Sequence, residues 1–417
     1  MGKKILIIGS GGREHALAVA FEKSASVAAV YVAPGNPGML LGTESVHCVP
    51  IPTTETDALV AFAQSEAIDY TFVGPEVAIE AGVVDAFREK NLLIIGPTKV
   101  AGQIETSKIF AKVMMEKAGI PTAGYQAFSE HDYKAAHHYV NALPLPVVIK
   151  ESGLAGGKGV YICEERTHAE RIVRETLLAR KRAIIVEEFL EGPEFSHFSL
   201  VNGEHIISLG IARDYKRAFD LDKGLNTGGM GAIAPVSLED AQLSDEIVAT
   251  IVRPLTKTMM ENGTPYTGIL YTGVMATKTG LKVIEFNARF GDPETQILLP
   301  LIEVDWLDLF KHHFNQTEPT LTYLPLQSVG VMIAAKGYPE KHVTGFALHL
   351  PEVPPNITVY YSGVSSVNGQ LLATGGRVFM VTCQDENLDR CREHIYGWLE
   401  GVDMENLFCR SDIGVSN

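Results

Sequence analysis

Three polar side chains alternate along one short segment, Glu285, Asn287 and Arg289, within the run K-V-I-E-F-N-A-R at 282–289. The β-branched residues before them favour a strand, in which residues two apart share a face. A carboxylate, an amide oxygen and a guanidinium in one row suit a divalent metal beside an anion. Mg²⁺ prefers oxygen ligands, and an arginine guanidinium can donate two parallel hydrogen bonds to a carboxylate or a phosphate. The segment therefore predicts a metal and anion site, with a solvated strand face and a surface turn as the alternative.

The composition limits the classes of protein to be considered. A chain of 417 residues predicts roughly two to four domains, and a formal net charge of -15 argues against non-specific nucleic-acid binding. Five scattered cysteines without a C-x-x-C pair indicate a reduced, cytoplasmic protein without a structural zinc or a disulfide frame. The opening M-G-K-K-I-L-I-I-G predicts a first strand rather than a signal peptide, and no apolar run reaches membrane-spanning length.

The first hundred residues have the pattern of a parallel α/β domain. An apolar run at 5–8 is followed by a glycine loop, Gly9-Ser10-Gly11-Gly12, and a helix expected to start near Arg13 or Glu14. Such a loop presents backbone N–H groups to a phosphate, although a tight turn with no ligand is the alternative. A dinucleotide fingerprint needs a glycine at 14 and an acidic residue after the second strand. Glu14 and the turn 34–38 stand there instead, which weakens a nicotinamide site.

The middle of the chain carries lysines around a second glycine loop. An amphipathic helix is predicted at 107–117, with Lys108 as a phosphate ligand and Lys112 as a solvated side chain. A strand ends at Lys150, and the loop that follows is not a P-loop, because its glycine and Ser/Thr positions do not match. A strand, a glycine loop with Lys158 and a second strand predict a flap that folds over a triphosphate, with a mobile hairpin tip as the alternative.

Later segments complete the predicted site and a closing domain. The edge of a strand at 184–188 can hydrogen-bond an adenine, and Glu194 can take a ribose diol. A strand at 267–275 is expected to pair with the segment that holds Glu285. After residue 327, strands at 328–335, 357–361 and 376–381 and a helix at 387–399 predict a small α+β domain, in which Cys391 serves packing.

Several longer strings make the chain similar to one family. They are G-S-G-G-R-E-H-A-L at 9–17, P-G-N-P-G at 34–38, N-T-G-G-M-G at 226–231, E-F-N-A-R-F-G-D-P-E-T-Q at 285–296 and A-T-G-G-R-V at 373–378. Over essentially its whole length the chain resembles the phosphoribosylamine–glycine ligases (GAR synthetases), which are ATP-grasp enzymes of purine synthesis.

The resemblance implies an α/β protein with the ATP-grasp fold. It implies an N-terminal Rossmann-like domain at 1–100, an ATP-grasp domain at 101–327 with a mobile flap at 121–190, and a C-terminal α+β domain at 328–417. The implied reaction joins glycine to 5-phosphoribosylamine through a glycyl phosphate, with ATP and Mg²⁺ or Mn²⁺. The implied partners are these small molecules, with no nucleic acid and no membrane, and a monomer is expected.

The resemblance also implies roles for individual residues. The metal is assigned to Glu285 and Asn287, and catalysis to Lys150, Lys158, Asp214 and Arg289. Nucleotide binding is assigned to Lys108, Lys150, Gly156, Gly157, Lys158, Glu187, Glu188, Leu190 and Glu194. Substrate binding is assigned to Gly9, Ser10, Gly11, Gly12, Arg13, Glu14, Gly35, Asn36, Pro37, Gly38, Glu76, Asp214, Arg289, Gly291, Asp292 and Pro293.

Some positions depart from the family pattern. Tyr215, Leu221 and Leu225 replace His, Gly and Pro, and the flap reads E-S-G-L-A-G-G-K-G where A-D-G-L-A-A-G-K-G is usual. An ATP-grasp paralogue with another acid or amine therefore stays open. A Rossmann oxidoreductase and an inactive nucleotide-binding regulator stand beside it as competing hypotheses, and intact Glu285 and Lys150 argue against the regulator.

Overall fold

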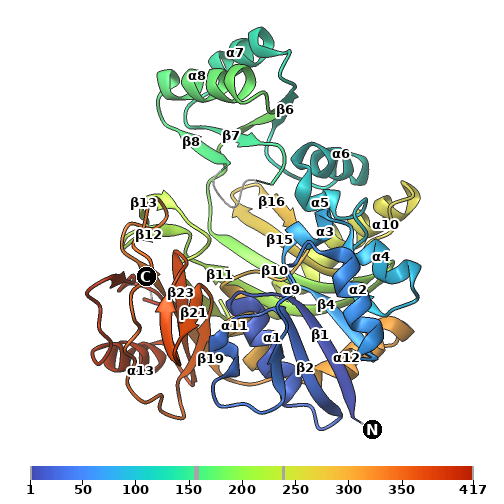
Figure 1. The fold of residues 1–417 in the computed structure, drawn as a ribbon. Coiled ribbons are helices and arrows are strands. Elements are labelled where there is room, and N and C mark those ends of the chain that lie inside the picture. The colour runs from blue at the N-terminus through green and yellow to red at the C-terminus, as the bar shows by residue number, and fades with distance from the viewer. Residues whose placement is uncertain (1, 155–158, 237–239, 416–417) are drawn as a thin grey trace.

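A five-stranded parallel sheet forms the N-terminal part of the computed structural model, which describes residues 2–154, 159–236 and 240–415 (Figure 1). Alternate residues of its central strand enter two cores, Ile5 and Ile7 on one face and Leu6 and Ile8 on the other. A strand buried on both faces explains why the sequence reads as one apolar run. The order is β3 (Val46–Cys48), β2 (Val27–Pro34), β1 (Lys3–Gly9), β4 (Tyr70–Val73) and β5 (Ile94–Ile95).

Helices cover both faces of this sheet. Helix α1 (Gly12–Glu22) packs on the face of Ile5, while α2 (Thr56–Ser65) and α4 (Val83–Glu89) pack on the face of Leu6. The predicted Rossmann-like parallel sheet is therefore confirmed. Its first helix begins at Gly12, one or two residues before the predicted start near Arg13 or Glu14.

A small antiparallel sheet makes a separate lobe at the top of Figure 1. Two helices, α7 (Tyr133–Ala142) and α8 (Arg166–Arg174), pack on one core with it. Its strands are β6 (Tyr125–Phe128), β9 (Ile184–Glu188), β7 (Val147–Glu151) and β8 (Val160–Cys163). The strands β7 and β8 pair in register around the predicted glycine loop. Gly156, Gly157 and Lys158 of that loop lie outside the described residues.

The largest sheet is antiparallel and runs through the middle of the molecule into its C-terminal part. Among the described residues it has nine strands, with β24 (Leu407–Phe408) pairing with β19. The order of the others is β16 (Gly280–Asn287), β15 (Thr267–Thr277), β10 (Glu194–Asn202), β11 (His205–Asp214), β14 (Gly231–Ala234), β19 (Gln327–Ala335), β23 (Arg377–Asp385) and β20 (Thr358–Tyr361). The C-terminal strands thus extend the central sheet, which the sequence did not predict.

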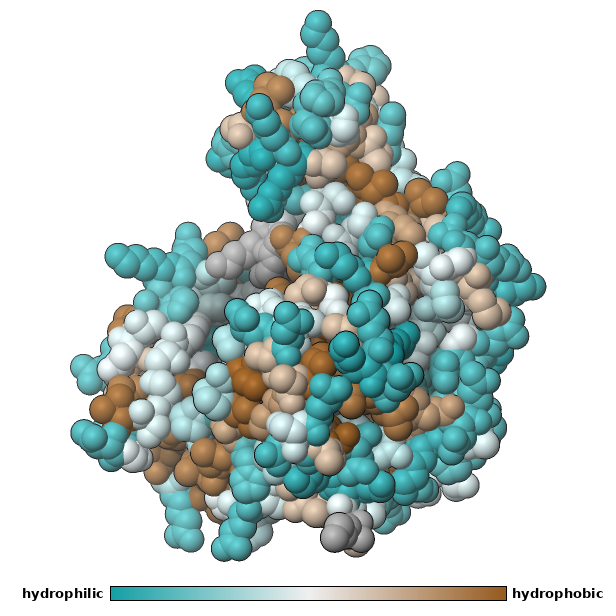
Figure 2. Space-filling model, turned by 45° about the vertical axis from the view of Figure 1, so that its right-hand side comes forward, coloured by the Kyte–Doolittle hydropathy of each residue, from teal (hydrophilic) through white to brown (hydrophobic). Residues whose placement is uncertain are grey.

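The predicted C-terminal helix is present as α13 (Leu388–Leu399), and the Asn387 side chain caps its start. Cys391 is buried on this helix, as predicted. No helix in the described ranges is both long and apolar enough to cross a membrane. The face seen in Figure 2 carries mostly hydrophilic side chains, with apolar ones in scattered groups.

A hairpin beside the central sheet is hydrogen-bonded to the C-terminal segment. Its strands are β12 (Arg217–Phe219) and β13 (Lys223–Asn226). The guanidinium of Arg410, a residue only 1% exposed, donates to Asp222 Oδ1 at 2.9 Å and to Asp412 Oδ1 at 2.8 Å. These contacts place the C-terminal segment against the loop that leads to the candidate site.

Candidate active site

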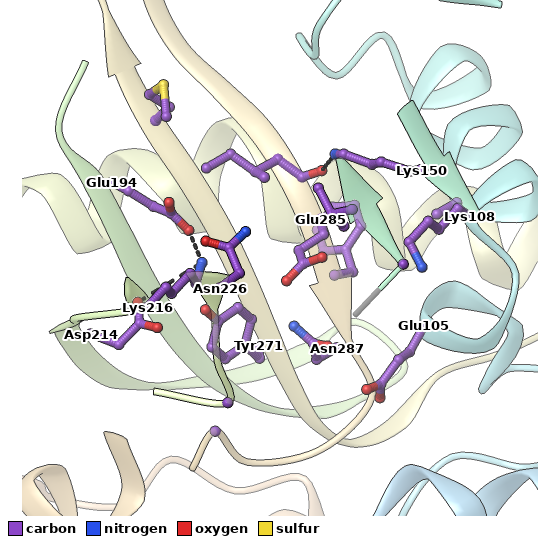
Figure 3. Close-up of a pocket in the computed structure, with 18 of the residues that line it drawn as sticks. Glu105, Lys108, Lys150, Glu194, Asp214, Lys216, Asn226, Tyr271, Glu285 and Asn287 are labelled. Carbon is purple, nitrogen blue, oxygen red and sulfur yellow. Dashed lines mark hydrogen bonds and ion pairs between the residues drawn. The ribbon is translucent and has the colours of Figure 1, made fainter. Parts of the chain in front are cut away.

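A cavity of about 790 Å³ lies between the small lobe and the central sheet. Strand β16 contributes Glu285 and Asn287 to its wall, and these side chains lie close together in Figure 3. The strand ends at Asn287, so Arg289 lies beyond it and not on its continuation, although its side chain still reaches the cavity. The predicted pairing of this strand with its neighbour is confirmed, because β15 and β16 are antiparallel partners.

The carboxyl group of Glu285 is held in its charged form. Burial opposes ionisation, but Lys216, Lys150 and Lys108 outweigh it and bring the pKa of Glu285 below its ordinary value. Among the described residues, no group of three or more His, Cys, Asp or Glu side chains is placed to hold a metal. A carboxylate and an amide oxygen fit a hard cation that takes its other ligands from phosphate oxygens and water.

Lysines from two elements surround this position. Lys108 is the first residue of α6 (Lys108–Ala118), and burial lowers the pKa of its ammonium. Lys150 Nζ donates to the carbonyl of Ile284 at 3.0 Å and lies 2.8 Å from Glu187 Oε2. Lys112 was predicted to be solvated, and this was wrong: its side chain is 4% exposed and forms an ion pair with Glu187.

Arg289 is enclosed by two carboxylates. Its Nε lies 3.1 Å from Glu76 Oε2, and its Nη2 lies 2.9 Å from Glu105 Oε1. Glu105 also accepts the backbone N–H of Ala288 at 2.7 Å, so it fixes the chain just after strand β16. The pKa of Glu105 is raised by burial, which Arg289 only partly offsets. Sequence reasoning missed Glu105, because an acidic residue on the short helix α5 (Gln103–Thr106) has no recognisable spacing to Arg289.

A second charged group lies on the far side of Glu285. Lys216 pairs with Glu194, and its Nζ lies 3.9 Å from Asp214 Oδ1. Burial raises the pKa of Asp214 to about 8, although Lys216 opposes the change. Burial also raises the pKa of Glu294, which lines the same cavity and was not predicted from the sequence.

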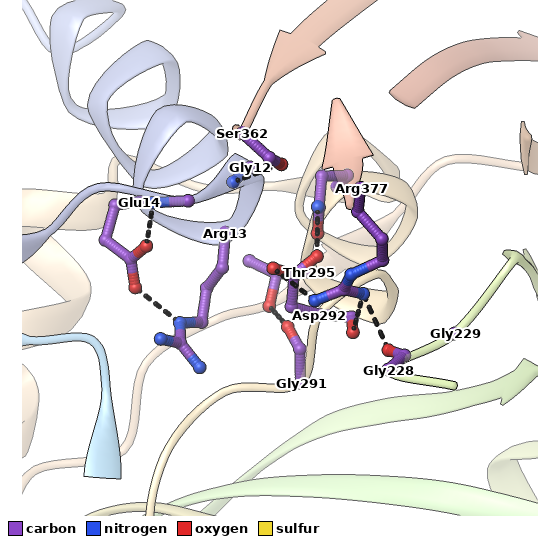
Figure 4. Close-up of polar contacts among 12 residues, drawn as sticks. Gly12, Arg13, Glu14, Gly228, Gly229, Gly291, Asp292, Thr295, Ser362 and Arg377 are labelled. Carbon is purple, nitrogen blue, oxygen red and sulfur yellow. Dashed lines mark hydrogen bonds and ion pairs between the residues drawn. The ribbon is translucent and has the colours of Figure 1, made fainter. Parts of the chain in front are cut away.

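The glycine loop of the N-terminal sheet forms hydrogen bonds within the chain (Figure 4). The N–H of Gly11 donates to Glu14 Oε2 at 2.7 Å, and the N–H of Gly12 donates to Ser362 Oγ at 3.0 Å. The other oxygen of Glu14 is 2.5 Å from Arg13 Nε. Two backbone N–H groups of the predicted phosphate-binding loop therefore already donate to acceptors within the protein.

The neighbouring loop at 34–38 is also bound to the C-terminal part. Asn36 Nδ2 donates to the carbonyls of Ser10 at 2.8 Å and Tyr361 at 3.0 Å. Nearby, Arg377 Nη1 donates to the carbonyls of Gly228 at 2.6 Å and Asp292 at 2.7 Å, which ties two cavity loops together (Figure 4). The family string at 373–378 includes Arg377, but no role was predicted for it.

The cavity brings together only part of the predicted set. The predicted residues in its wall are Arg13, Glu76, Lys108, Lys150, Glu187, Glu188, Leu190, Glu194, Asp214, Glu285, Asn287, Arg289, Gly291 and Asp292. The predicted residues outside this lining are Gly9, Ser10, Gly11, Gly12, Glu14, Gly35, Asn36, Pro37, Gly38 and Pro293.

The sheets and the charged cavity together define an ATP-grasp protein. The matching family models are those of phosphoribosylglycinamide synthetase: the N domain at 3–105, the ATP-grasp (A) domain at 106–295 and the C domain at 328–416. The chain belongs to this family.

Individual relatives agree with this assignment. A phosphoribosylamine–glycine ligase of Lactococcus lactis is 44% identical over 413 residues, which are 99% of either chain. The crystal structure of phosphoribosylamine–glycine ligase from Thermotoga maritima is 29% identical, with a TM-score of 0.84 over 98% of this chain and 99% of that one. A biotin carboxylase from Campylobacter jejuni, 15% identical, shares the fold alone, with a TM-score of 0.72 over 98% of this chain and 92% of that one.

Proposed function

We propose that this chain is a phosphoribosylamine–glycine ligase, which joins glycine to 5-phosphoribosylamine at the expense of ATP in purine biosynthesis. The observation that carries the proposal is the cavity, in which a charged Glu285 and Asn287 lie among Lys108, Lys150 and Lys216. Membership of the family over nearly the whole chain supports the choice of substrates.

The chemistry has two transfers. A carboxylate oxygen of glycine attacks the γ-phosphorus of ATP, and the bond to ADP breaks, which gives glycyl phosphate. The amine nitrogen of phosphoribosylamine then attacks the glycyl carbonyl carbon. The nitrogen loses a proton, and inorganic phosphate leaves as the amide forms. Neither transfer needs a side-chain nucleophile, so the protein acts by positioning, by charge and by exclusion of water.

The residues divide this work. Glu285 and Asn287 would hold Mg²⁺ or Mn²⁺, which when bound supplies positive charge to the phosphate oxygens. Lys108 and Lys150 spread further positive charge along the triphosphate, and Lys158 is assigned the same role from the sequence. Arg289 is proposed to hold the glycine carboxylate.

The remaining roles concern the glycine ammonium and the ribose phosphate. Asp214 is proposed for the ammonium, and the loops at 9–14 and 34–38 for the ribose phosphate. A monomer in the cytoplasm, with domain boundaries near residues 100 and 327, remains the prediction from the sequence.

The test is ADP release with Mg²⁺, supplying glycine and freshly made phosphoribosylamine together and then omitting each. We expect turnover that requires both. Turnover with only another acid or amine would keep the nucleotide site and refute the choice of substrates. A chain that neither binds nor turns over ATP would refute the proposal as a whole.

A further inference from the structure

Lys112 lies in the wall of the cavity, and its ammonium contacts three other groups of the protein. Its Nζ is 2.7 Å from Glu187 Oε1, donates to Thr122 Oγ1 at 2.7 Å and lies 5.0 Å from the ring centroid of Tyr125. The contact with Glu187 is an ion pair, the contact with Thr122 is a hydrogen bond and the contact with Tyr125 is a cation–π contact. The ammonium of Lys112 is therefore surrounded by groups of the protein itself.

Lys150 uses the other oxygen of the same carboxylate. Its Nζ lies 2.8 Å from Glu187 Oε2 and donates to the carbonyl of Ile284 at 3.0 Å. The Lys150 side chain is 7% exposed and lines the cavity. The two lysines thus divide Glu187 between them, one oxygen each.

Lys112, Glu187 and Lys150 form one buried group of charged side chains. Two ammonium groups and one carboxylate leave one net positive charge, next to the place where a polyanion would lie. Without Lys112, Glu187 would cancel the charge of Lys150 entirely. The side chains of Lys112 and Glu187 are each only 4% exposed, so water screens this effect weakly.

Lys112 also connects helix α6 to strand β16. Thr122, which accepts from Lys112, donates its own hydroxyl to the carbonyl of Val283 at 2.7 Å. Val283 lies two residues before Glu285 on β16. The lysine on α6 is thereby linked to the strand that holds the proposed metal ligands.

We propose that Lys112 is a positioning residue for the nucleotide. It pairs with one oxygen of Glu187, so that Glu187 does not cancel the positive charge of Lys150 beside the triphosphate. The proposal rests on the proposed use of ATP. In it, Lys112 affects nucleotide binding through Glu187 and Lys150 and does not itself contact the nucleotide.

The experiment measures binding of Mg²⁺–ATP and of adenosine by calorimetry, without glycine, so that it does not depend on turnover. We expect Lys112→Met to weaken ATP binding about 10-fold, equivalent to about 1.4 kcal/mol, and to change adenosine binding much less. Lys112→Arg keeps the charge and should lose less affinity. The double variant Lys112→Met/Glu187→Gln restores one net positive charge and should recover most of the ATP affinity.

The matched control is Lys117→Met on the same helix. Lys117 is exposed and contacts Asn262 Oδ1 at 2.8 Å, away from the cavity, so ATP binding should not change. Circular dichroism of each variant establishes that it is folded.

Two results would overturn the role of Lys112. One is an equal loss of ATP and adenosine binding that the double variant does not recover, because this would mean that Lys112 only packs. The other is unchanged ATP binding in folded Lys112→Met. Failure of the wild-type chain to bind ATP would instead refute the proposed function on which the role depends.

Discussion

Replacing Arg410 by methionine should weaken the attachment of the hairpin β12–β13 to the C-terminal segment. The guanidinium bonds Asp222 at 2.9 Å, Asp412 at 2.7 and 2.8 Å and the carbonyl of Arg217 at 3.1 Å. It also lies 5.1 Å from the ring centroid of Tyr215, which occupies a position where the family usually has histidine. Methionine keeps most of the side-chain volume but none of these polar contacts, so the change tests the contacts rather than the packing.

The expected loss of stability depends on the carboxylates that lose their partner when Arg410 is replaced. Removing one partner of a fully buried ion pair costs about 3–5 kcal/mol, because the remaining charge is stranded. Here the Asp412 and Asp222 side chains are 21% and 63% exposed and can regain water, so we expect about 2 kcal/mol. The cost falls on the attachment of the hairpin, and about 2 kcal/mol corresponds to a roughly 30-fold larger opening constant.

The assay is hydrogen exchange at the amide of Leu221, which donates to Asp412 Oδ2 at 2.8 Å. We expect it to exchange about 30-fold faster in Arg410→Met, while amides of β1 keep their rates. Arg390→Met is the matched control, because its exposed ion pairs with Asp385 and Glu386 should matter little. Unchanged exchange at Leu221 would refute the idea that Arg410 holds the hairpin.

The same contact predicts a pH dependence. Partial burial opposes ionisation of Asp412, but the hydrogen bond from Arg410 prevails and lowers its pKa to about 2. A carboxyl group whose pKa is lower in the folded state stabilises the fold above its ordinary pKa near 4 and loses that contribution as the pH falls through about 2. Protection of Leu221 should decline in that window in the wild type. A decline of the same size in Arg410→Met would contradict this explanation.

Three further outcomes are expected in the site. Glu285→Ala should abolish ATP turnover and keep the fold; wild-type turnover would remove Glu285 from metal binding. Arg289→Lys should raise the KM for glycine strongly, because an ammonium cannot replace the planar guanidinium that Glu76 and Glu105 hold in place. An unchanged dependence of the rate on glycine would exclude this role. Because burial raises the pKa of Asp214 to about 8, its stabilising contribution is complete below about pH 4 and is lost as the pH rises toward 8. Urea titrations of Asp214→Asn should therefore vary less with pH over this window, and parallel curves would contradict the shift.

Local patterns predicted several of the strands and a few of the helices closely. The strand at Ile184–Glu188 has the predicted bounds, and the helix after Ser107 ends within one residue of the prediction. These elements depend on the hydrophobic period and on caps, which are properties of neighbouring residues. Strand β16 was predicted in the same way, from the β-branched residues before Glu285 and Asn287.

Contacts between distant segments were not predictable in this way. Lys112 lies four residues from Lys108, and a helix pattern alone places both outside the apolar stripe. Only the packing of the small lobe brings Glu187 to Lys112 and excludes water from it. For the same reason the sequence did not show that the strand beginning at Gln327 continues the central sheet, since its partner β14 lies far back in the chain.

The glycine loop at 9–12 shows how one residue changes the meaning of a motif. A Cβ at Gly9 would approach Glu14 Cδ to 2.4 Å, and one at Gly74 would approach Glu14 Oε1 to 2.0 Å, so these glycines make room for a buried carboxylate. That carboxylate accepts the Gly11 N–H, the kind of donor that a dinucleotide pyrophosphate would need. The Rossmann oxidoreductase is therefore disfavoured by the contact that Glu14 makes, and not merely by the absence of a third glycine. A ribose phosphate bound at this loop would have to draw on donors other than the Gly11 N–H, or displace Glu14 from it.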